Sequence, residues 1–311
     1  MTAELRHRLA DYLALRRGLG YALVRDEKLL VQFIGWLEQH DRHMVTVDDA
    51  VTWVRLPDMA GPSWLRMRMQ VVRGFAGYLH TLDPAHEVPP PGLVPARVGR
   101  AVPYLYSDTD IAALMAEAAA LKSAMRQATI ATLIGLLAVT GMRMGEVIGL
   151  DDTDFDPEHG LLTVRHAKLG KHRLLPLHPS TVTAVNGYRG MRDEAFPHPV
   201  SAALLISATG TRLLNYNVGQ TFAKLARNAG LRPRSPGCRP CPHALRHTFA
   251  VNTLLDWYRD GGDVAARLPM LSTYLGHVAP ANTYWYLEAA PELLAEAAHR
   301  LEHRAEGGDR R

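Results

Sequence analysis

The sequence predicts a mainly α-helical protein that joins an N-terminal helical bundle to a larger, mostly helical domain with a small antiparallel β-sheet. Three observations favour this fold class. Apolar residues recur at helical spacing through most of the chain, two neighbouring segments alternate in polarity as strands do, and a proline-rich segment separates the two parts. The length of 311 residues agrees with two domains, because one domain usually holds about 100–200 residues.

The N-terminal bundle is predicted over residues 1–83. Apolar residues recur at helical spacing in two runs within residues 2–40, which predicts two helices. Thr46 is a suitable N-cap for a third helix, because its hydroxyl can accept a hydrogen bond from the first turn. A fourth helix is expected over about residues 64–80 with Ser63 as its N-cap, and the short turns favour a bundle.

A linker is expected at residues 84–104, which contain six prolines and two glycines. Prolines at this density cannot continue a helix and favour an extended, semi-rigid connector. The second domain is therefore predicted to span residues 105–311.

The second domain is predicted to begin with helices and to continue through two strands. Ser107 opens a first helix that ends near Leu121, and a strongly apolar second helix ends at Gly141. Residues 160–166 and 173–177 read as strands with a glycine-containing turn between them. Further helices are expected at residues 180–192, 216–229, 243–257, 263–275 and 291–304.

Composition excludes several classes of protein. The chain has 47% hydrophobic and 21% charged residues, which are ordinary values for a soluble globular protein. No apolar run approaches the ~20 residues of a membrane span, and the charged N-terminus lacks a signal-peptide core. Two cysteines cannot form a disulfide framework, which fits a cytoplasmic protein. A net charge of +4 makes nucleic acid a candidate partner.

Four segments carry residue types that can support chemistry. In the first, Arg143 and Glu146 lie three residues apart at the start of a helix, and nearby glycines permit close backbone approach. A helix joint with a surface Arg–Glu pair explains them equally well. The second is the hairpin turn with Lys168, where a lysine can donate a proton to a leaving oxygen. A solvated turn is the alternative.

The third segment places His243 and Arg246 on one face of a helix, since they are three residues apart. Pro242 makes His243 a first-turn residue, where the helix dipole favours a neutral imidazole. The alternative is a histidine near a helix start with an exposed arginine.

The fourth segment begins with Gly276, which is suited to end a helix just before His277. A new helical turn is expected to follow, capped by Asn282 or Thr283. Three adjacent aromatic residues at 284–286 cannot all face the core, so at least one is expected to be exposed or to lie in a cleft.

In this order, the segments together resemble the tyrosine recombinases of the phage-integrase family. The motifs that carry the resemblance are Thr-Gly-x-Arg-x-x-Glu at 140–146, Lys168, His-x-x-Arg at 243–246, Leu-Gly-His at 275–277 and Tyr286. The resemblance covers residues from about 105 to 300 and implies the DNA breaking-rejoining enzyme fold. More loosely, the N-terminal bundle is similar to the family's core-binding (SAM-like) DNA-binding domain, and the segment around Tyr286 is similar to transposon-associated members.

The resemblance implies a site-specific recombinase or integrase that cuts and rejoins double-stranded DNA without a metal or cofactor. Tyr286 is the expected nucleophile, forming a 3′-phosphotyrosyl intermediate, because a phenolate is both a nucleophile and a good leaving group. Arg143 and Arg246 are expected to hold the non-bridging phosphate oxygens, since guanidinium groups stay charged and offer a fixed fork of donors.

The resemblance also implies roles for four further residues. Lys168 is expected to protonate the departing 5′ oxygen; Lys171 lies on the same turn, but the spacing to the next strand favours Lys168. His243 is expected to act as an acid or base near the tyrosine, and His277 to donate a hydrogen bond to the phosphate. Glu146 is expected to be buried and to orient the first arginine.

Five basic residues are candidate DNA contacts: Arg66, Arg68, Arg73, Lys171 and Arg173. The three arginines on the helix at 64–80 fit a solvated face equally well. In the family the bundle grips one side of the duplex and the linker spans it, which predicts binding that weakens with salt.

Cys238 and Cys241 depart from the family pattern. With His243 and His247 they make a Cys2His2 set, but their spacing is far tighter than in the usual zinc sites and the metal would occupy the catalytic histidine. Free thiols in a rigid loop are the favoured interpretation, and no metal is expected.

The last predicted helix, at 291–304, is amphipathic. Its apolar stripe packs either on its own domain or on a neighbouring subunit, and the second option predicts a homotetramer on two DNA sites.

Rival functions are a topoisomerase of the same chemistry, a non-catalytic DNA-binding regulator and, last, a metal-dependent nuclease. Integration, excision and transposition all stay open.

Overall fold

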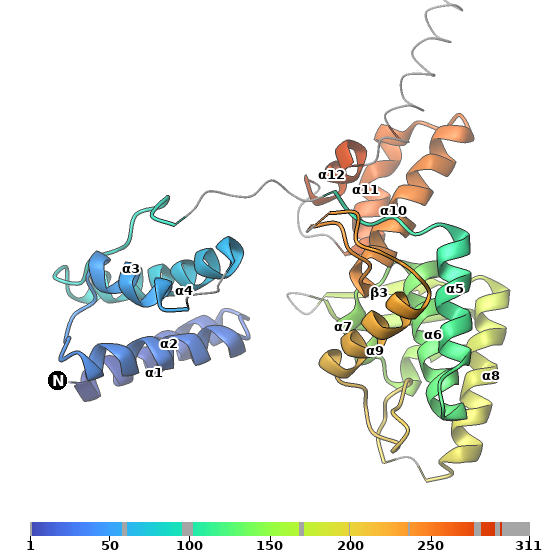
Figure 1. Cartoon of the computed structure of the whole chain (residues 1–311), viewed down its shortest axis with the longest axis horizontal. Coiled ribbons are helices and arrows are strands. Elements are labelled where there is room, and N and C mark those ends of the chain that lie inside the picture. The colour runs from blue at the N-terminus through green and yellow to red at the C-terminus, as the bar shows by residue number, and fades with distance from the viewer. Residues whose placement is uncertain are drawn as a thin grey trace, which may run out of the picture. The chain divides into compact units, whose positions relative to one another are not determined.

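The computed structural model describes residues 2–57, 61–94, 102–167, 171–198, 200–235, 237–276, 281–289 and 293. It divides into two compact units, Met1–Arg100 and Ala101–Arg311 (Figure 1). The division falls within the segment predicted as a linker. Each unit has its own hydrophobic core, and each is described by itself.

The first unit is built from the four predicted helices, which are α1 (Thr2–Gly18), α2 (Val24–Gln39), α3 (Val47–Arg55) and α4 (Pro62–Leu82). Its core joins apolar side chains from all four helices, among them Leu9, Phe33, Trp53 and Phe75. The helical spacing of Leu5, Leu9 and Leu13 places the buried face of α1 correctly, whereas Leu15 and Leu19 of the same apolar run are exposed.

The helix starts of this unit agree with the sequence in one case and differ in another. Thr46 caps α3 as predicted, because its Oγ1 accepts a hydrogen bond from the N–H of Asp49 at 3.1 Å. The prediction that Ser63 caps the fourth helix is wrong. Gly61 is the N-cap and Pro62 is the first residue of α4, where a fixed φ suits the helix and no N–H is needed.

The beginning of the predicted linker, residues 84–94, packs against the first unit. Arg73 on α4 donates hydrogen bonds to the carbonyls of Pro89 at 2.7 Å and Pro90 at 2.8 Å. Val94 is buried in the core of the bundle. These prolines therefore lie along the bundle, and the described part of the connector does not act as a free spacer.

The second unit contains, in chain order, α5 (Asp108–Ala119), α6 (Ala124–Thr140), α7 (Met144–Gly149), the short 3-10 helix η1 (Asp152–Asp154), β1 (Phe155–Asp156), β2 (Leu161–Ala167), β3 (Lys171–Pro176), α8 (Pro179–Ala195), α9 (Asn215–Asn228), α10 (Pro242–Arg259), α11 (Val264–Leu275) and α12 (Ala281–Ala289). The strongly apolar α6 is central: it packs on α5, α8 and α10 (Figure 1). The mainly helical fold with a small antiparallel sheet is confirmed.

The sheet has the order β1-β2-β3 and is antiparallel throughout. Leu162 in the central strand pairs with Phe155 on one side and Leu175 on the other, and all three side chains are buried. The strand β1 was not predicted, because two residues are too short to show alternation.

Two glycines end helices in the left-handed conformation, as the sequence predicts. Gly141 ends α6 with φ 59°, and Gly276 ends α11 with φ 67°. By contrast, α12 already begins at Ala281, so the prediction that Asn282 or Thr283 caps it is wrong. Of the helix predicted at 291–304, the structure describes Leu293 alone, and the rest of that prediction lies outside the described residues.

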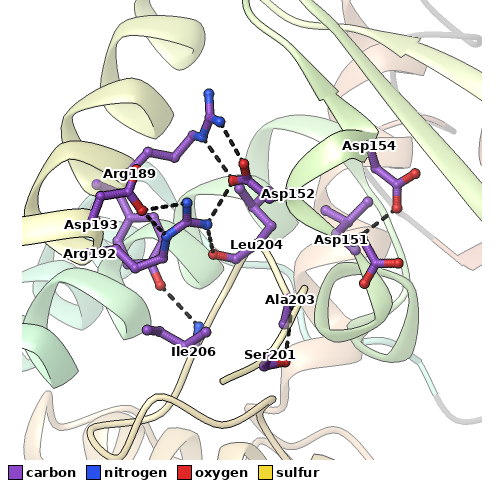
Figure 2. Close-up of polar contacts among 12 residues, drawn as sticks. Asp151, Asp152, Asp154, Arg189, Arg192, Asp193, Ser201, Ala203, Leu204 and Ile206 are labelled. Atoms are coloured by element: carbon purple, nitrogen blue, oxygen red, sulfur yellow. Dashed lines mark hydrogen bonds and ion pairs between the residues drawn. The ribbon is translucent and has the colours of Figure 1, made fainter. Parts of the chain in front are cut away.

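Ion pairs fix the segment that follows α7 (Figure 2). The carboxylate of Asp152 accepts hydrogen bonds from Arg189 at 2.6 Å and 2.9 Å and from Arg192 at 2.7 Å, and both arginines come from α8. Arg192 also donates to the carbonyl of Leu204 at 3.1 Å. The network joins α8, η1 and the segment before α9.

Candidate active site

The start of α7 brings Arg143 and Glu146 together. Arg143 is the N-cap residue, and its N–H donates to the Glu146 carboxylate at 2.9 Å. The Arg143 Nη1 donates to the same carboxylate, also at 2.9 Å. Glu146 is nearly buried, whereas the Arg143 side chain remains 41% exposed. The alternative of a surface Arg–Glu pair is therefore wrong for the glutamate.

Arg173 of β3 is the second partner of Glu146. Its Nη1 and Nη2 donate to the two carboxylate oxygens at 3.1 Å and 2.7 Å, which is a bidentate arrangement. Burial alone would raise the pKa of Glu146, but the hydrogen bonds from Arg173 and Arg143 outweigh it and bring the pKa to about 2. The glutamate is therefore ionised at neutral pH.

Arg246 lies on α10 and is 1% exposed. Its Nη1 donates to the carbonyl of Gly141 and its Nη2 to the carbonyl of Leu275, both at 2.8 Å. Arg143 donates to the next carbonyl at the end of α11, that of Gly276, at 3.1 Å. The negative end of α11 thus holds both guanidinium groups, and the alternative of an exposed Arg246 is wrong.

The guanidinium groups of Arg143 and Arg173 also converge on the Cα of Gly276. A Cβ at Gly276 would lie 2.9 Å from Nη1 of Arg173 and 3.7 Å from Nη1 of Arg143. Among the described contacts of the three arginines, Glu146 supplies the one carboxylate. Three positive charges against one negative charge make a strongly cationic site.

The positive charge of this site affects the pKa of Arg246. Burial, followed by the positive charge of Arg143, lowers the pKa of Arg246 to about 10. Tyr286 and Glu146 oppose this change. The guanidinium remains protonated at neutral pH, and an anion placed beside it would relieve the repulsion among the arginines.

His243 follows Pro242 in the first turn of α10, as predicted, and its side chain is open to solvent at the rim of the site. Partial loss of hydration, with the positive charges of Arg246 and Arg143, lowers its pKa. The imidazole is therefore neutral at neutral pH. This direction agrees with the neutral imidazole predicted from the position of His243 at the helix start.

Tyr286 lies on α12, and its ring packs toward α10. The ring is 2% exposed and lies 5.5 Å from the ring of His247 and 5.4 Å from that of Trp285, measured between centroids. His247 directly follows Arg246 on α10, so the Tyr286 ring packs on the helix that carries this arginine. The exposed member of the aromatic run is Tyr284, at 50%.

Several predicted residues fall outside what the structure describes. Lys168 and His277 lie outside the described residues, and for Lys171 the backbone alone is described, as part of β3. The assignment of a leaving-group acid and of the histidine after Gly276 therefore stays a prediction.

Two of the three arginines predicted as DNA contacts on α4 are bonded within the first unit. Arg68 is buried: its guanidinium stacks 3.6 Å from the ring centroid of Trp53 and donates to the Trp53 carbonyl at 2.8 Å. Arg73 is bonded to the two proline carbonyls described above, and Arg66 is half-buried. A long arginine stem covers apolar surface well, which the prediction of a solvated or DNA-facing helix did not consider.

Arg173, another candidate DNA contact, is bonded within the second unit. Its side chain is 11% exposed, and two of its donors are bonded to Glu146. Its position in the alternating strand does not reveal this partner, because Glu146 lies on another element.

The two cysteines are free thiols, with Cys238 buried and Cys241 half-buried as the N-cap of α10. No group of three or more His, Cys, Asp or Glu side chains that could hold a metal ion occurs among the described residues. The Cys2His2 alternative thus finds no geometry to support it there.

The sequence analysis considered His247 only as a possible metal ligand and gave it no place beside the tyrosine. Its ring lies 4.6 Å from that of His243, and also contacts those of Trp285 and Tyr286. The spacing of four residues from His243 on one helix could have indicated that the two rings share a face.

Residues 105–292 match the profile of the phage integrase family, which is more than half of the chain. The chain belongs to the phage integrase family. As a member it falls in the enzyme class of the tyrosine-type site-specific recombinases, which agrees with the resemblance read from the motifs.

Relatives of this phage integrase family member match it over most of their length. It is 40% identical over 310 residues to the Sinorhizobium fredii protein y4rB, named as an integrase/recombinase, covering 98% of this chain and 99% of that one. It is 31% identical over 248 residues to the tyrosine recombinase XerD of Caulobacter vibrioides, covering 75% of this chain and 73% of XerD.

Its fold is that of solved family structures. The integrase of transposon Tn1549, in complex with transposon right end DNA, matches with a TM-score of 0.65 at 18% identity, covering 96% of this chain and 99% of that one. Within the described residues, no helix combines the length and apolar character that crossing a membrane requires.

Proposed function

We propose that this protein is a site-specific DNA recombinase that cuts and rejoins double-stranded DNA through a 3′-phosphotyrosyl intermediate on Tyr286. The observation that carries the proposal is the convergence of three arginines and one glutamate, with a buried tyrosine packed on the helix that carries Arg246. A phosphodiester carries one negative charge on oxygens that a guanidinium fork fits well. The site is thus suited to bind and polarise a DNA backbone phosphate.

The chemistry follows from the groups present. The Tyr286 oxygen attacks the phosphorus, and the bond from phosphorus to the 5′ oxygen breaks. His243, held neutral, is suited to accept the phenolic proton, and Lys168 is suited to give a proton to the 5′ oxygen. Attack by a 5′ hydroxyl on the phosphotyrosine reverses both changes, so rejoining needs no separate energy source.

Tyr286 is buried in the DNA-free structure. The proposed reaction therefore requires that DNA binding uncovers its hydroxyl toward Arg246. Arg143 is well placed to make the first contact with phosphate, because its side chain is more exposed than that of Arg246.

The proposal extends to partners and assembly. The first unit serves as the core-binding DNA-binding domain, and the helix predicted at 291–304 docks on a neighbouring subunit in a homotetramer on two DNA sites. Because y4rB is named as an integrase/recombinase and the Tn1549 integrase acts on transposon DNA, we place this protein on a mobile element. The site of action is cytoplasmic DNA.

The test is covalent trapping of DNA by the full-length protein. Nicked duplexes from the DNA that flanks the gene are incubated with protein, and protein-linked DNA is recovered under denaturing conditions and sequenced. The wild-type protein is expected to yield adducts at one position, attached through the 3′ end. Tyr286→Phe is expected to yield none while still binding DNA.

Tyr284→Phe is the matched control, because Tyr284 carries the same phenol two residues away but faces solvent. It is expected to form adducts like the wild type. Adducts that persist in Tyr286→Phe and disappear in Tyr284→Phe would overturn the assignment of the nucleophile. An absence of any adduct with wild-type protein, on DNA that it binds, would overturn the function.

A further inference from the structure

Arg173 belongs to the site through its bonds to Glu146, and its guanidinium does not face solvent. Its bidentate bond to the carboxylate uses Nη1 and Nη2, the two terminal donors, and its side chain is 11% exposed. Arg143, which shares the carboxylate, is 41% exposed. Of the two arginines, Arg143 therefore has the side chain that can meet an incoming phosphate.

Glu146 connects the two arginines. One carboxylate oxygen accepts from Nη1 of both Arg143 and Arg173, and the other accepts from Nη2 of Arg173 and from the Arg143 N–H. The Arg143 side chain is held at one further point, the carbonyl of Gly276. A change in the tilt of the carboxylate therefore moves the Arg143 guanidinium directly.

The neighbourhood of Gly276 limits where the two guanidinium groups can go. Both lie close to the position that a Cβ would occupy, and Arg173 is the nearer. Arg173 thus lies between β3 and the end of α11, where it bonds both oxygens of the carboxylate that Arg143 also uses. Bidentate Arg–carboxylate pairs hold geometry better than single contacts.

We propose that Arg173 is a positioning residue for the DNA cleavage reaction, which acts on Arg143 through Glu146, and that it is not a DNA contact. The inference rests on the proposed function. Arg173, a residue of β3, thus orients Arg143, which is expected to bind the phosphate.

The test separates the rate of cleavage from DNA affinity in the full-length protein. The probe is the nicked duplex recovered by covalent trapping. Arg173→Gln is expected to slow adduct formation at saturating DNA on the order of 100-fold, since small misplacement of a clamp has effects of this size. Its dissociation constant for DNA and the salt dependence of binding are expected to stay as in the wild type.

A DNA contact predicts the opposite pattern. Loss of a phosphate contact weakens binding and lowers the slope of log affinity against log salt by about 1. That pattern, with an unchanged rate at saturation, would overturn the proposal.

A double-mutant cycle tests the route through Glu146. If Arg173 acts through the carboxylate, adding Arg173→Gln to Glu146→Gln is expected to slow cleavage by less than about threefold beyond Glu146→Gln alone. Two multiplicative losses would show that Arg173 acts by another route, and would overturn the proposal.

Controls keep these outcomes distinct. Arg165→Gln removes an arginine that pairs with Asp154 from the neighbouring strand β2, and is expected to leave the rate unchanged. If Arg173→Gln does not fold, Arg173→Lys carries the test, because it keeps the charge and loses the fork. Adducts from wild-type protein with an unaltered rate in Arg173→Gln would refute this inference and leave the proposed function standing.

Discussion

At the scale of residues, the site depends on one carboxylate placed among cations. Glu146 receives hydrogen bonds from two guanidinium groups and one N–H, and the resulting pKa is about 2. Its folded pKa lies below its ordinary value of 4.5, so the ionised form stabilises the fold at neutral pH. This stabilisation is present above about pH 4.5 and is lost as the pH falls toward 2.

Glu146→Gln tests that stabilisation. The wild type is expected to exceed the variant in free energy of unfolding by about 3 kcal/mol near pH 7, with the difference shrinking below pH 4.5. Urea unfolding of both proteins from pH 7 to pH 3.5 measures it. A difference that stays constant over this range would contradict the ionised, hydrogen-bonded carboxylate. The exposed Glu158→Gln is the control, with an expected change within about 0.5 kcal/mol.

Gly276→Ala tests the close approach at the end of α11. The residue has φ 67°, and a Cβ would lie 2.9 Å from the Arg173 guanidinium. The variant is expected to lose roughly 1–2 kcal/mol of stability from its left-handed backbone and to slow adduct formation by displacing Arg173. Thermal unfolding and the trapping assay measure the two effects.

Gly187→Ala is the matched control for that substitution. Gly187 lies within α8 with open space around its Cα, so alanine is expected to stabilise the protein by about 0.5–1 kcal/mol. Wild-type adduct formation and stability in Gly276→Ala would show that the space beside Arg173 is not restricted.

At the scale of elements, the sequence predicts the helices and their ends where the signal is local. Ser107 caps α5 with a capping box to Asp110, and Gly141 and Gly276 end their helices, because these effects depend on a few consecutive residues. Pairings between elements carry no such signal. The bond from Arg173 to Glu146 spans 27 residues, and the stacking of Arg68 on Trp53 joins two helices.

For the site, too, the sequence predicts local features but not contacts between elements. The motifs indicate which residues belong to the site, since Arg143, Glu146 and Arg246 come together in the structure. They do not show that Tyr286 packs inward while Tyr284 faces solvent, because the register of α12 against α10 depends on tertiary packing.

Arg212 provides a test of how α7 is held. Its Nη1 donates to the carbonyls of Ile148 at 2.9 Å and Leu150 at 3.0 Å, at the end of a helix of six residues. Arg212→Ala leaves these acceptors without that donor, so a loss of about 1–3 kcal/mol is expected, with slower adduct formation. Chemical unfolding and covalent trapping measure both. The control Arg259→Ala, at an exposed pair, is expected to change stability by less than about 0.5 kcal/mol.

At the scale of the whole molecule, the second unit holds the three arginines of the site and also the proposed nucleophile. Tyr286 packs on α10 of its own chain, against the ring of His247, which directly follows Arg246. Each protomer is therefore expected to cut with its own tyrosine, even within a larger assembly on DNA.

Mixing two inactive variants tests this expectation. Tyr286→Phe and Arg143→Gln, combined on the trapped duplex, are expected to give no adduct above background, because no chain carries both groups. Gel analysis of protein-linked DNA measures it, and mixtures of either variant with wild type serve as positive controls. Recovery of adduct from the mixed variants would mean that the tyrosine is supplied by a neighbouring subunit.

Among the described contacts, the end of α11 holds its arginines with peptide oxygens and adds no acidic side chain of its own. A main-chain dipole anchors a cation without cancelling its charge, so the pocket keeps its electric field while its geometry stays set. An arriving nucleotide backbone thus meets donors that need little rearrangement. A protein that anchored the same groups with aspartates would be equally rigid, but it would repel the very anion it has to grip.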